Sequence, residues 1–257
     1  MPGFHIDDDD RPIGRMLSRR EVLTLFGGTG AALATGAIAA GALAQSPSAA
    51  TGAAASALPS CVVVPELTEG PYFVDERLDR SDIRSDTATG VMSQGARFDL
   101  SWLVSRIDGS ACTPLAGAMV DIWHCDAAGA YSDVRDPGFS TDGQDFLRGY
   151  QLTDGDGRAT FTTIYPGWYD GRAVHIHFKV RTDPDQSSGT EFTSQLFFDE
   201  AFTDTVYTAE PYAQRGPRTI RNDQDGIYQQ SGGQTLVTVS PTADGYAGTL
   251  AVGIRMS

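Results

Sequence analysis

The chain has 257 residues and a formal net charge of −14 at pH 7, from 33 acidic and 19 basic residues. This excess of negative charge argues against nucleic acid and anionic membrane surfaces as partners. The 29 glycines and 13 prolines favour a turn-rich β protein over a helical one.

The first part of the chain has the pattern of an export signal. Arg19 and Arg20 precede a Gly- and Ala-rich apolar stretch at residues 22–43, and residues 42–44 (Ala-Leu-Ala) form a small-residue cleavage pattern. Paired arginines before a mildly hydrophobic segment are typical of the bacterial twin-arginine route, which carries folded proteins with cofactors already inserted. We therefore expect residues 1–44 to engage the export machinery, with an extracellular, periplasmic or cell-surface location. An uncleaved anchor helix or an ordinary amphipathic helix is the alternative.

Residues 45–60 are rich in Ala, Ser, Gly and Pro and are expected to form a flexible linker. The remaining residues, 61–257, are enough for one domain with a full core. The three cysteines, Cys61, Cys112 and Cys125, have no Cys-x-x-Cys spacing, which disfavours a cysteine-based zinc site. Export permits one disulfide, and the odd number then leaves one thiol free. The sequence does not say which pair forms the bond.

Several segments of this domain have the patterns expected of β-strands. Residues 97–104 alternate apolar and polar side chains, as a half-buried strand does. Further strands are expected at residues 118–124, 158–164, 172–180, 194–198, 236–240 and 248–254. The last two are expected to form a closing pair, and no 11-residue window after the export signal has convincing helical periodicity. These features predict an all-β fold, a β-sandwich with long functional loops at residues 125–150 and 200–230.

Two Asp-Gly pairs lie directly before one of the expected strands. Asp154-Gly155-Asp156-Gly157 precedes residues 158–164, and an Asp-Gly pair between two strands predicts a β-hairpin. A calcium loop is the alternative, but no downstream Glu completes the EF-hand pattern.

The candidate functional residues centre on His175 and His177. On a β-strand, residues i and i+2 point to the same face, so both imidazoles are expected to project into one space. Neutral imidazoles side by side are suited to a transition metal. Tyr131 and Tyr169 lie at strand ends from which they can reach the imidazoles, and phenolate oxygen favours Fe(III) over zinc. The alternative for each tyrosine is a packed aromatic side chain with its hydroxyl satisfied.

The motifs around these residues resemble those of intradiol ring-cleavage dioxygenases. Residues 120–132, Val-Asp-Ile-Trp-His-Cys-Asp-Ala-Ala-Gly-Ala-Tyr-Ser, are similar to the first iron-ligand motif of that family. Residues 165–169 and 172–178 are similar to the motifs of the remaining ligands, and residues 68–72 to its Thr-x-Gly-Pro-Tyr segment. The resemblance covers roughly residues 61–200. Within that family, the chain resembles a protocatechuate-type catalytic core and secreted intradiol dioxygenase-like proteins.

The resemblance implies a mononuclear, non-haem Fe(III) cofactor held by Tyr131, Tyr169, His175 and His177, with a solvent hydroxide as fifth ligand. By similarity, Tyr131 and His175 are equatorial, whereas Tyr169 and His177 are axial. The implied substrates are a catechol, which binds through both oxygens and displaces Tyr169, and O2. The implied product is a cis,cis-muconate-type diacid. The sequence does not give the preferred catechol or the oligomeric state, and a homo-oligomer is compatible with it.

Further residues take their roles from the same resemblance. Arg172 matches an arginine that stabilises the negative, ketonised substrate, and Gln195 matches a glutamine that contacts this arginine. His124 matches a structural histidine, so we expect a satisfied core side chain and not a metal ligand. Trp168 and Tyr72 are candidates for lining the pocket.

Two other functions are compatible with parts of the sequence. A non-catalytic exported β-sandwich module that binds carbohydrate or cell wall would keep the fold without iron. A zinc hydrolase would use His175 and His177 and would also need a carboxylate ligand and a general base. Asp170 is the only close candidate for these roles.

Overall fold

The computed structural model describes residues 63–136, 139–184 and 189–255. The export signal expected at residues 1–44 and the linker expected at residues 45–60 lie outside these described residues. In the part of the chain that the structure describes, no helix is long and apolar enough to span a membrane.

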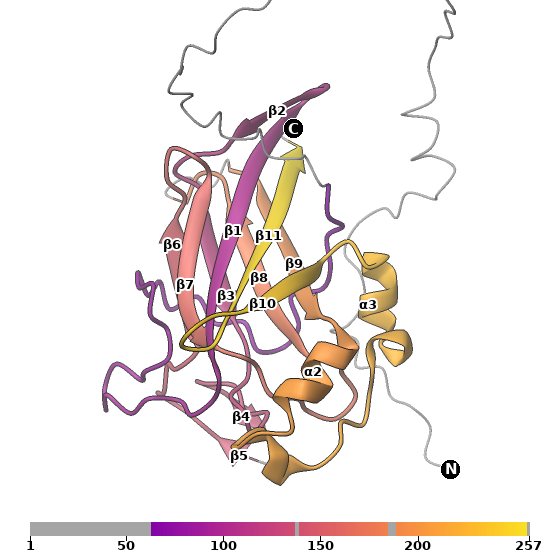
Figure 1. Cartoon of the computed structure of the whole chain (residues 1–257). Helices are drawn as coiled ribbons and strands as arrows, with labels where there is room; N and C mark the ends of the chain where they lie inside the picture. Colours follow the sequence, from indigo (N-terminus) through magenta and orange to yellow (C-terminus); the bar gives the residue numbers. More distant parts are fainter. Residues whose placement is uncertain (1–62, 137–138, 185–188, 256–257) are drawn as a thin grey trace, which may run out of the picture. The chain divides into compact units, whose positions relative to one another are not determined.

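The strands form a β-sandwich, which confirms the predicted all-β fold (Figure 1). One layer, sheet A, contains β1 (Arg97–Asp108), β2 (Ala111–Pro114), β7 (Arg158–Ile164), β10 (Leu236–Pro241) and β11 (Tyr246–Arg255). The other layer, sheet B, contains β3 (Met119–Trp123), β6 (Arg148–Leu152), β8 (His175–Arg181) and β9 (Glu191–Phe198). β10 also pairs in parallel with β9, which joins the two sheets along one edge.

The remaining elements are short, and several lie where the sequence predicted loops. They are the ribbon of β4 (Arg135–Asp136) and β5 (Phe139–Ser140), helices α2 (Glu200–Val206) and α3 (Gly226–Ser231), and 3-10 helices at Tyr212–Arg215 and Asn222–Gln224. Asp199 caps α2 and Asp225 caps α3, each by accepting from backbone amides of the first turn. These helices therefore depend on their caps and on packing, which a search for apolar periodicity does not detect.

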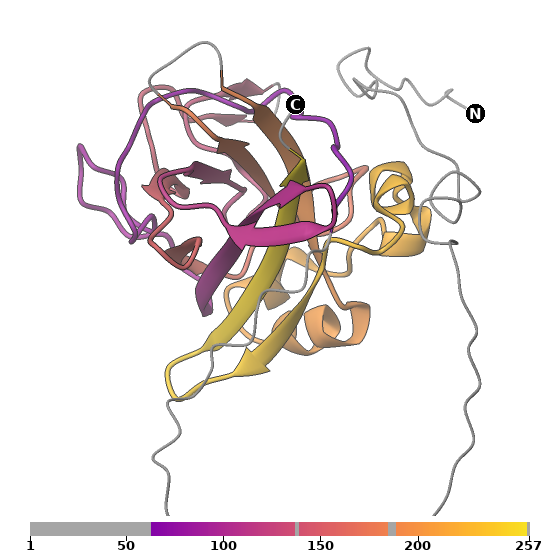
Figure 2. The same cartoon turned by 90° about the horizontal axis from the view of Figure 1, so that it is seen from above.

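The main core lies between the two sheets, whose ribbons Figure 2 shows from above. Side chains alternate in burial along the first part of β1, as predicted, and Trp102 packs on Phe178 of β8 with ring centroids 5.8 Å apart. β1 continues to Asp108, beyond the predicted end, because it is paired along both edges. β11 lies on one side of β1, and β7 followed by β2 lies on the other. The closing pair of β10 and β11 is confirmed.

The turn at residues 154–157 is present, but it does not form a hairpin. The Asp154 carboxylate accepts from the backbone amides of Asp156 and Arg158, at 2.9 Å each. However, β6 pairs with β3 and β7 pairs with β1, so the turn carries the chain from sheet B to sheet A. The hairpin prediction is wrong because the turn is anchored on sheet A, where Val104 N donates to Gly157 O at 2.8 Å.

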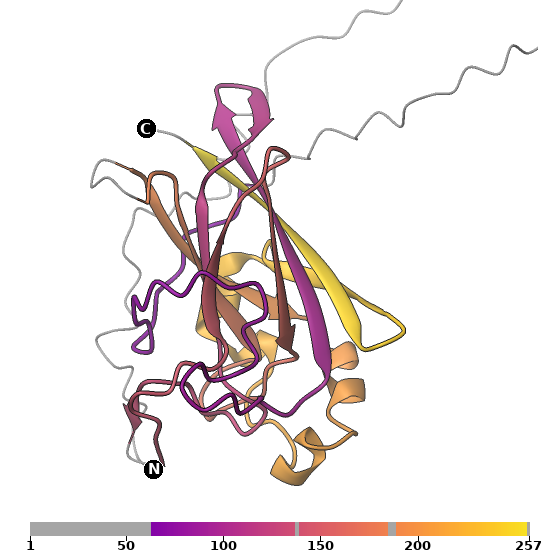
Figure 3. The ribbon, with the colours of Figure 1, turned by 90° about the vertical axis from the view of Figure 1, so that its left-hand side faces the viewer.

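An extended segment, residues 65–80, crosses the outer face of sheet B, and we call it the strap (Figure 3, dark purple). It contacts the strands in the order in which they lie in the sheet. On β9, Thr193 O accepts from Leu67 N at 3.0 Å. On β8, Lys179 forms an ion pair with Glu69 of the strap.

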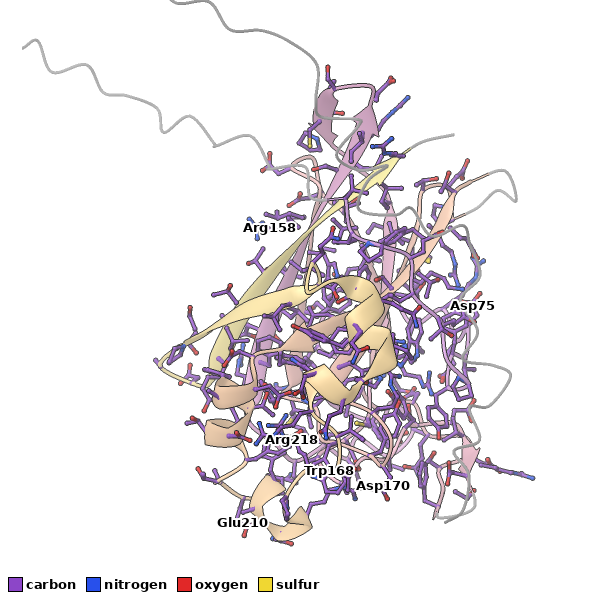
Figure 4. The ribbon with its side chains drawn as sticks, turned by 90° about the vertical axis from the view of Figure 1, so that its right-hand side faces the viewer. Asp75, Arg158, Trp168, Asp170, Glu210 and Arg218 are labelled. Carbon is purple, nitrogen blue, oxygen red and sulfur yellow. The ribbon has the colours of Figure 1, made fainter. Side chains whose placement is uncertain are left out.

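The strap continues across the other two strands. Phe73 packs on Trp123 of β3, with ring centroids 4.8 Å apart, and Leu78 O accepts from Tyr150 N of β6 at 2.8 Å. As a result, all seven residues of β8 are buried, although the sandwich core covers only one face of this strand. In Figure 4, Asp75 of the strap and Arg158 of β7 lie on opposite sides of the sandwich.

The two cysteines among the described residues are in different states. Cys112 is disulfide-bonded, and Cys125 is a buried free cysteine. Cys61 lies outside the described residues.

Two glycines in the turn between the sheets should differ strongly in how far substitution by Ala lowers the free energy of unfolding. Gly157 has φ +72°, and an added Cβ would collide with the Val104 carbonyl oxygen, whereas nothing lies within 4 Å of a Cβ at Gly155. We expect Gly157→Ala to lower the free energy of unfolding by about 2–4 kcal/mol. Gly155→Ala is the matched control and should change it by less than about 0.5 kcal/mol. Urea unfolding of both variants checks this, and equal midpoints would contradict the anchored turn.

Candidate metal centre

The polar face of β8 lies beneath the strap and carries the two predicted histidines. His175, His177, Lys179 and Arg181 alternate with apolar residues that face the sandwich core. The Nε2 atoms of His175 and His177 are 3.0 Å apart, so the imidazoles meet as their i, i+2 spacing predicts. The two charged residues are paired, Lys179 with Glu69 and Arg181 with carboxylates that include Asp121 and Asp75.

Both predicted tyrosines join the imidazoles from loops. Tyr131 lies in the loop after β3, and its hydroxyl oxygen is 3.4 Å from His175 Nε2. Tyr169 lies in the segment between β7 and β8, and its hydroxyl oxygen is 3.2 Å from the same nitrogen. Tyr131 is 1% exposed and the two histidines are 1–2% exposed, whereas Tyr169 is half-buried. Four side chains, two from β8 and two from separate loops, thus converge on one buried point.

Asp126 ties the two tyrosine-bearing loops together. Its carboxylate accepts from Ala130 N at 2.9 Å, which folds the turn that leads to Tyr131. Its backbone carbonyl accepts from Gly167 N at 3.2 Å, two residues before Tyr169. An added Cβ at Gly167 would collide with that carbonyl, so a residue without a side chain is needed for this close approach.

The four side chains fit a metal ion. His175 Nδ1 lies 2.6 Å from Ala173 O, to which it donates, so Nε2 carries the lone pair that faces His177 and the phenols. Donors about 2.1 Å from one ion and at right angles to each other lie about 3.0 Å apart. The observed spacings of 3.0–3.4 Å match this. The potential ligands are two imidazoles and two phenols. The hard oxygen atoms of the phenols favour a cation in a high oxidation state.

Burial determines the charges of these groups. It lowers the pKa of His175 and of His177 well below the usual value, so both imidazoles are neutral and able to bind a metal. Burial raises the pKa of Tyr169 to about 12 and that of Tyr131 well above its usual value, and nearby Arg172 opposes the increase at both. Phenolates at this site therefore need a bound cation to be stable near neutral pH.

Aromatic and glycine residues around the four side chains complete the walls of the site. The Trp123 ring stacks on His177 at 5.0 Å between centroids, and Tyr72 stacks on Tyr131 at 4.5 Å. Gly70 of the strap has φ +73°, and a Cβ there would be 3.1 Å from His177 Cε1. The Thr-x-Gly-Pro-Tyr motif was the sequence signal for Gly70 and Tyr72. Trp123 lies within the motif at residues 120–132, but no role was predicted for it.

Arg172 and Gln195 make the contact that the sequence analysis expected. β8 begins at His175, so Arg172 precedes the strand and strand alternation does not direct its side chain. Arg172 Nη2 donates to Gln195 Oε1 at 2.5 Å, and Gln195 Nε2 donates to Thr68 O of the strap at 2.9 Å. Arg172 Nε also donates to Asp225 Oδ2 at 2.9 Å, a partner that the sequence analysis missed.

His124 and Asp170 do not face this point. His124 is 0% exposed, and its ring nitrogens bond to Cys125 O at 2.8 Å and Thr163 Oγ1 at 2.7 Å, which confirms the expected core histidine. The Asp170 carboxylate accepts from Thr219 Oγ1 at 3.2 Å. Among the described residues, no group of three His, Cys, Asp or Glu side chains could hold a metal. A zinc hydrolase therefore lacks its carboxylate ligand there.

Trp168 lies beside Tyr169, near the lower end of the sandwich, where Figure 4 labels it next to Asp170. Its ring is covered by the Arg215 guanidinium at 4.5 Å. The structure therefore gives Trp168 a packing partner, and its role in lining a pocket stays a prediction.

Comparison with known proteins gives consistent matches over most of the described chain. A family model described as Dioxygenase matches residues 68–222, which is more than half of the chain. The intradiol ring-cleavage dioxygenase from Tetranychus urticae is 32% identical with a TM-score of 0.66, covering 76% of this chain and 95% of that one. The dioxygenase domain of a dioxygenase carbohydrate-binding protein fusion from Streptomyces sp. SirexAA-E is 27% identical with a TM-score of 0.55, covering 76% and 99%.

A longer relative is matched over part of its length. Catechol 1,2-dioxygenase 1 of Acinetobacter lwoffii is 28% identical over 151 residues, which are 50% of this chain and 45% of that protein. The chain spans about half the length of the curated relatives that it matches.

The buried state of His124 predicts a pH dependence of stability. Burial lowers the pKa of His124 from its usual 6.5 to about 4. Between these values the unfolded state binds more protons than the folded state, so this histidine makes stability fall as the pH is lowered. We expect His124→Asn to have a shallower decline in unfolding free energy from pH 6.5 to 4 than the wild type. Urea unfolding across this range checks it, and parallel curves would contradict the assignment.

Proposed function

Because the chain belongs to the intradiol ring-cleavage dioxygenase family, we propose that it binds a mononuclear, non-haem Fe(III) and cleaves catechol-type aromatics with O2. The bond cleaved joins the two hydroxyl-bearing carbons, and the products are muconate-type diacids. One observation carries the proposal: Tyr131 Oη, Tyr169 Oη and His177 Nε2 each lie 3.0–3.4 Å from His175 Nε2 at a buried point.

The four ligands have different tasks in this proposal. Fe(III), when bound, supplies a Lewis-acid template that takes both catechol oxygens and makes the ring reactive toward O2. His175 and His177 bind as neutral donors, and Tyr131 as a buried phenolate that offsets the positive charge. Tyr169 is the more exposed tyrosine, so it would be the ligand better placed to turn toward an entering substrate. Burial raises the pKa of Tyr169 to about 12, so a Tyr169 phenolate away from the metal would be a base able to take a catechol proton.

Arg172 supplies positive charge beside the reacting ring. The side chain is in reach of both tyrosines, since it opposes the burial-driven rise of their pKa values. A fixed guanidinium in a buried site stabilises negative charge that develops on the substrate far better than water does. Gln195 holds one end of this guanidinium through Nη2.

The export pattern at residues 1–44 supports a role outside the cytoplasm. We propose that the enzyme acts on extracellular catechols, such as plant-derived phenolics, within aromatic compound catabolism. A panel of catechols added outside intact producing cells, with O2 consumption as the readout, tests this. Activity found only after lysis would contradict it.

Colour tests the metal and its ligands. Tyrosinate bound to Fe(III) absorbs visible light by charge transfer, so the iron-replete protein should be red to burgundy. Tyr131→Phe and Tyr169→Phe should each weaken or shift the band, measured per bound iron. Tyr207→Phe is the matched control, because the Tyr207 hydroxyl donates to Pro166 O at 2.8 Å and should leave the band unchanged. A colourless iron-replete protein would sink the proposal.

Turnover tests the reaction. The iron-loaded protein should consume one O2 for each catechol and form a product with muconate-type ultraviolet absorbance. Arg172→Lys should lower kcat about 10²-fold, because a compact ammonium does not reproduce the guanidinium fork. Oxygen uptake with a catechol panel measures both effects. An absence of turnover with every catechol would favour a binding module that kept the fold.

A further inference from the structure

Asp225 is a buried carboxylate with no part in the function proposed above. It is 2% exposed and accepts four hydrogen bonds, two on each oxygen. Oδ1 accepts from the amides of Ile227 and Tyr228 at 2.8 and 3.0 Å, which caps α3. Oδ2 accepts from Arg172 Nε at 2.9 Å and from Ala173 N at 2.8 Å. A buried charge with every acceptor position engaged has one orientation.

The support behind Asp225 is also held firmly. Ile227 of α3 packs in a small apolar cluster with Leu67 of the strap, Ala173 and Phe197 of β9. Just before the cap, Asn222 Nδ2 donates to Phe198 O at 2.8 Å. α3 is therefore fixed to sheet B and to the strap. Because the cap bonds fix Asp225 to α3, its Oδ2 atom is a rigid anchor for its partners.

We propose that Asp225 is a positioning residue for the ring-cleavage reaction, because its carboxylate sets the direction of the Arg172 guanidinium at the metal centre. Two of the three guanidinium nitrogens are held, Nε by Asp225 and Nη2 by Gln195. No described residue accepts from Nη1, which leaves that nitrogen for a substrate oxygen. The proposal rests on the proposed function of Arg172.

The same carboxylate oxygen also supports a metal ligand. Oδ2 fixes the backbone of Ala173, and Ala173 O accepts from His175 Nδ1 at 2.6 Å. One anchor thus serves both the arginine and the residue that orients an imidazole. Burial disfavours the charged form of Arg172, but Tyr169 and Asp225 more than offset this and raise its pKa. The guanidinium therefore stays charged in the site.

Asp225 lies just outside the part of the chain that the family model matches. Asp225 is 53 positions from Arg172 in the chain, and it lies beyond residue 222, where the family match ends. From the sequence alone, an Asp before a short helix predicts only a helix cap. Its second role becomes visible only when α3 is seen beside the start of β8.

Asp225→Asn in the full iron-loaded chain tests the proposal. Asparagine can still cap α3, but it loses the charge that pairs with Arg172. We expect kcat to fall about 10- to 100-fold with a smaller change in KM, because the interaction matters most when negative charge develops on the substrate. The visible band should stay, because all four ligands remain. Unchanged kcat would overturn the proposal.

Asp199→Asn is the matched control for loss of cap charge. Asp199 caps α2 by accepting from Phe202 N at 2.9 Å and has no bond to Arg172. Its variant should keep the wild-type kcat. An equal loss of kcat in both variants would show a general effect of helix capping and would overturn a specific role for Asp225.

A double-mutant cycle asks whether Asp225 acts through Arg172. We expect Arg172→Lys alone and Arg172→Lys with Asp225→Asn to have the same kcat within about twofold. Losses that multiply in the double variant would show that Asp225 acts through its other contact, Ala173, and would overturn the role of Asp225 in directing Arg172. If Asp225→Asn does not fold, Asp225→Ser retains a good cap residue while removing the anchor, and the same outcomes decide.

The Nε–H signal of Arg172 in NMR spectra separates this proposal from the proposed function. In the iron-free protein, Asp225→Asn should shift this signal and speed its exchange with water, whereas Asp199→Asn should not. An absence of wild-type turnover would overturn the proposed function, while this signal would still decide whether Asp225 holds Arg172. An unchanged signal would overturn the positioning role.

Discussion

Burial of β8 on both faces is the constraint on which the site depends. One face carries apolar side chains into the sandwich core, and the other lies beneath the strap. Polar groups buried on that second face need partners, because an unpaired buried charge or donor is costly. Lys179 forms an ion pair with Glu69, and Arg181 forms one with Asp121. His175 Nδ1 donates to Ala173 O, whereas its Nε2 atom faces only His177 and the two phenols.

The strands supply the histidines and Gln195, whereas the tyrosines and Arg172 come from loops that Asp126 and Asp225 hold in place. Asp126 joins the two loops that carry Tyr131 and Tyr169. Asp225 joins α3 to the segment that carries Arg172. A loop gains rigidity when a carboxylate accepts several backbone amides, since moving it would leave donors unpaired. The tyrosines and the arginine can therefore be as well ordered as residues on a strand.

The sequence predicted those elements whose signal is local. The alternation of β1 and the closing pair of β10 and β11 needed no knowledge of distant residues. The turn at residues 154–157 was recognised, but its two strands joined different sheets, because each was paired by a strand elsewhere in the chain. α2 and α3 were missed because they are short and depend on aspartate caps and tertiary packing.

For the site, the sequence by itself determined the histidine pair, since side-chain alternation along a strand follows from local backbone geometry. Flanking motifs then named Tyr131 and Tyr169 as their partners. Only the tertiary structure decided which way Arg172 points and gave Asp225 its role, because these depend on α3 packing beside the start of β8. The reason is physical: strand geometry is a property of neighbouring residues, whereas a contact between positions 53 apart exists only after the chain has folded.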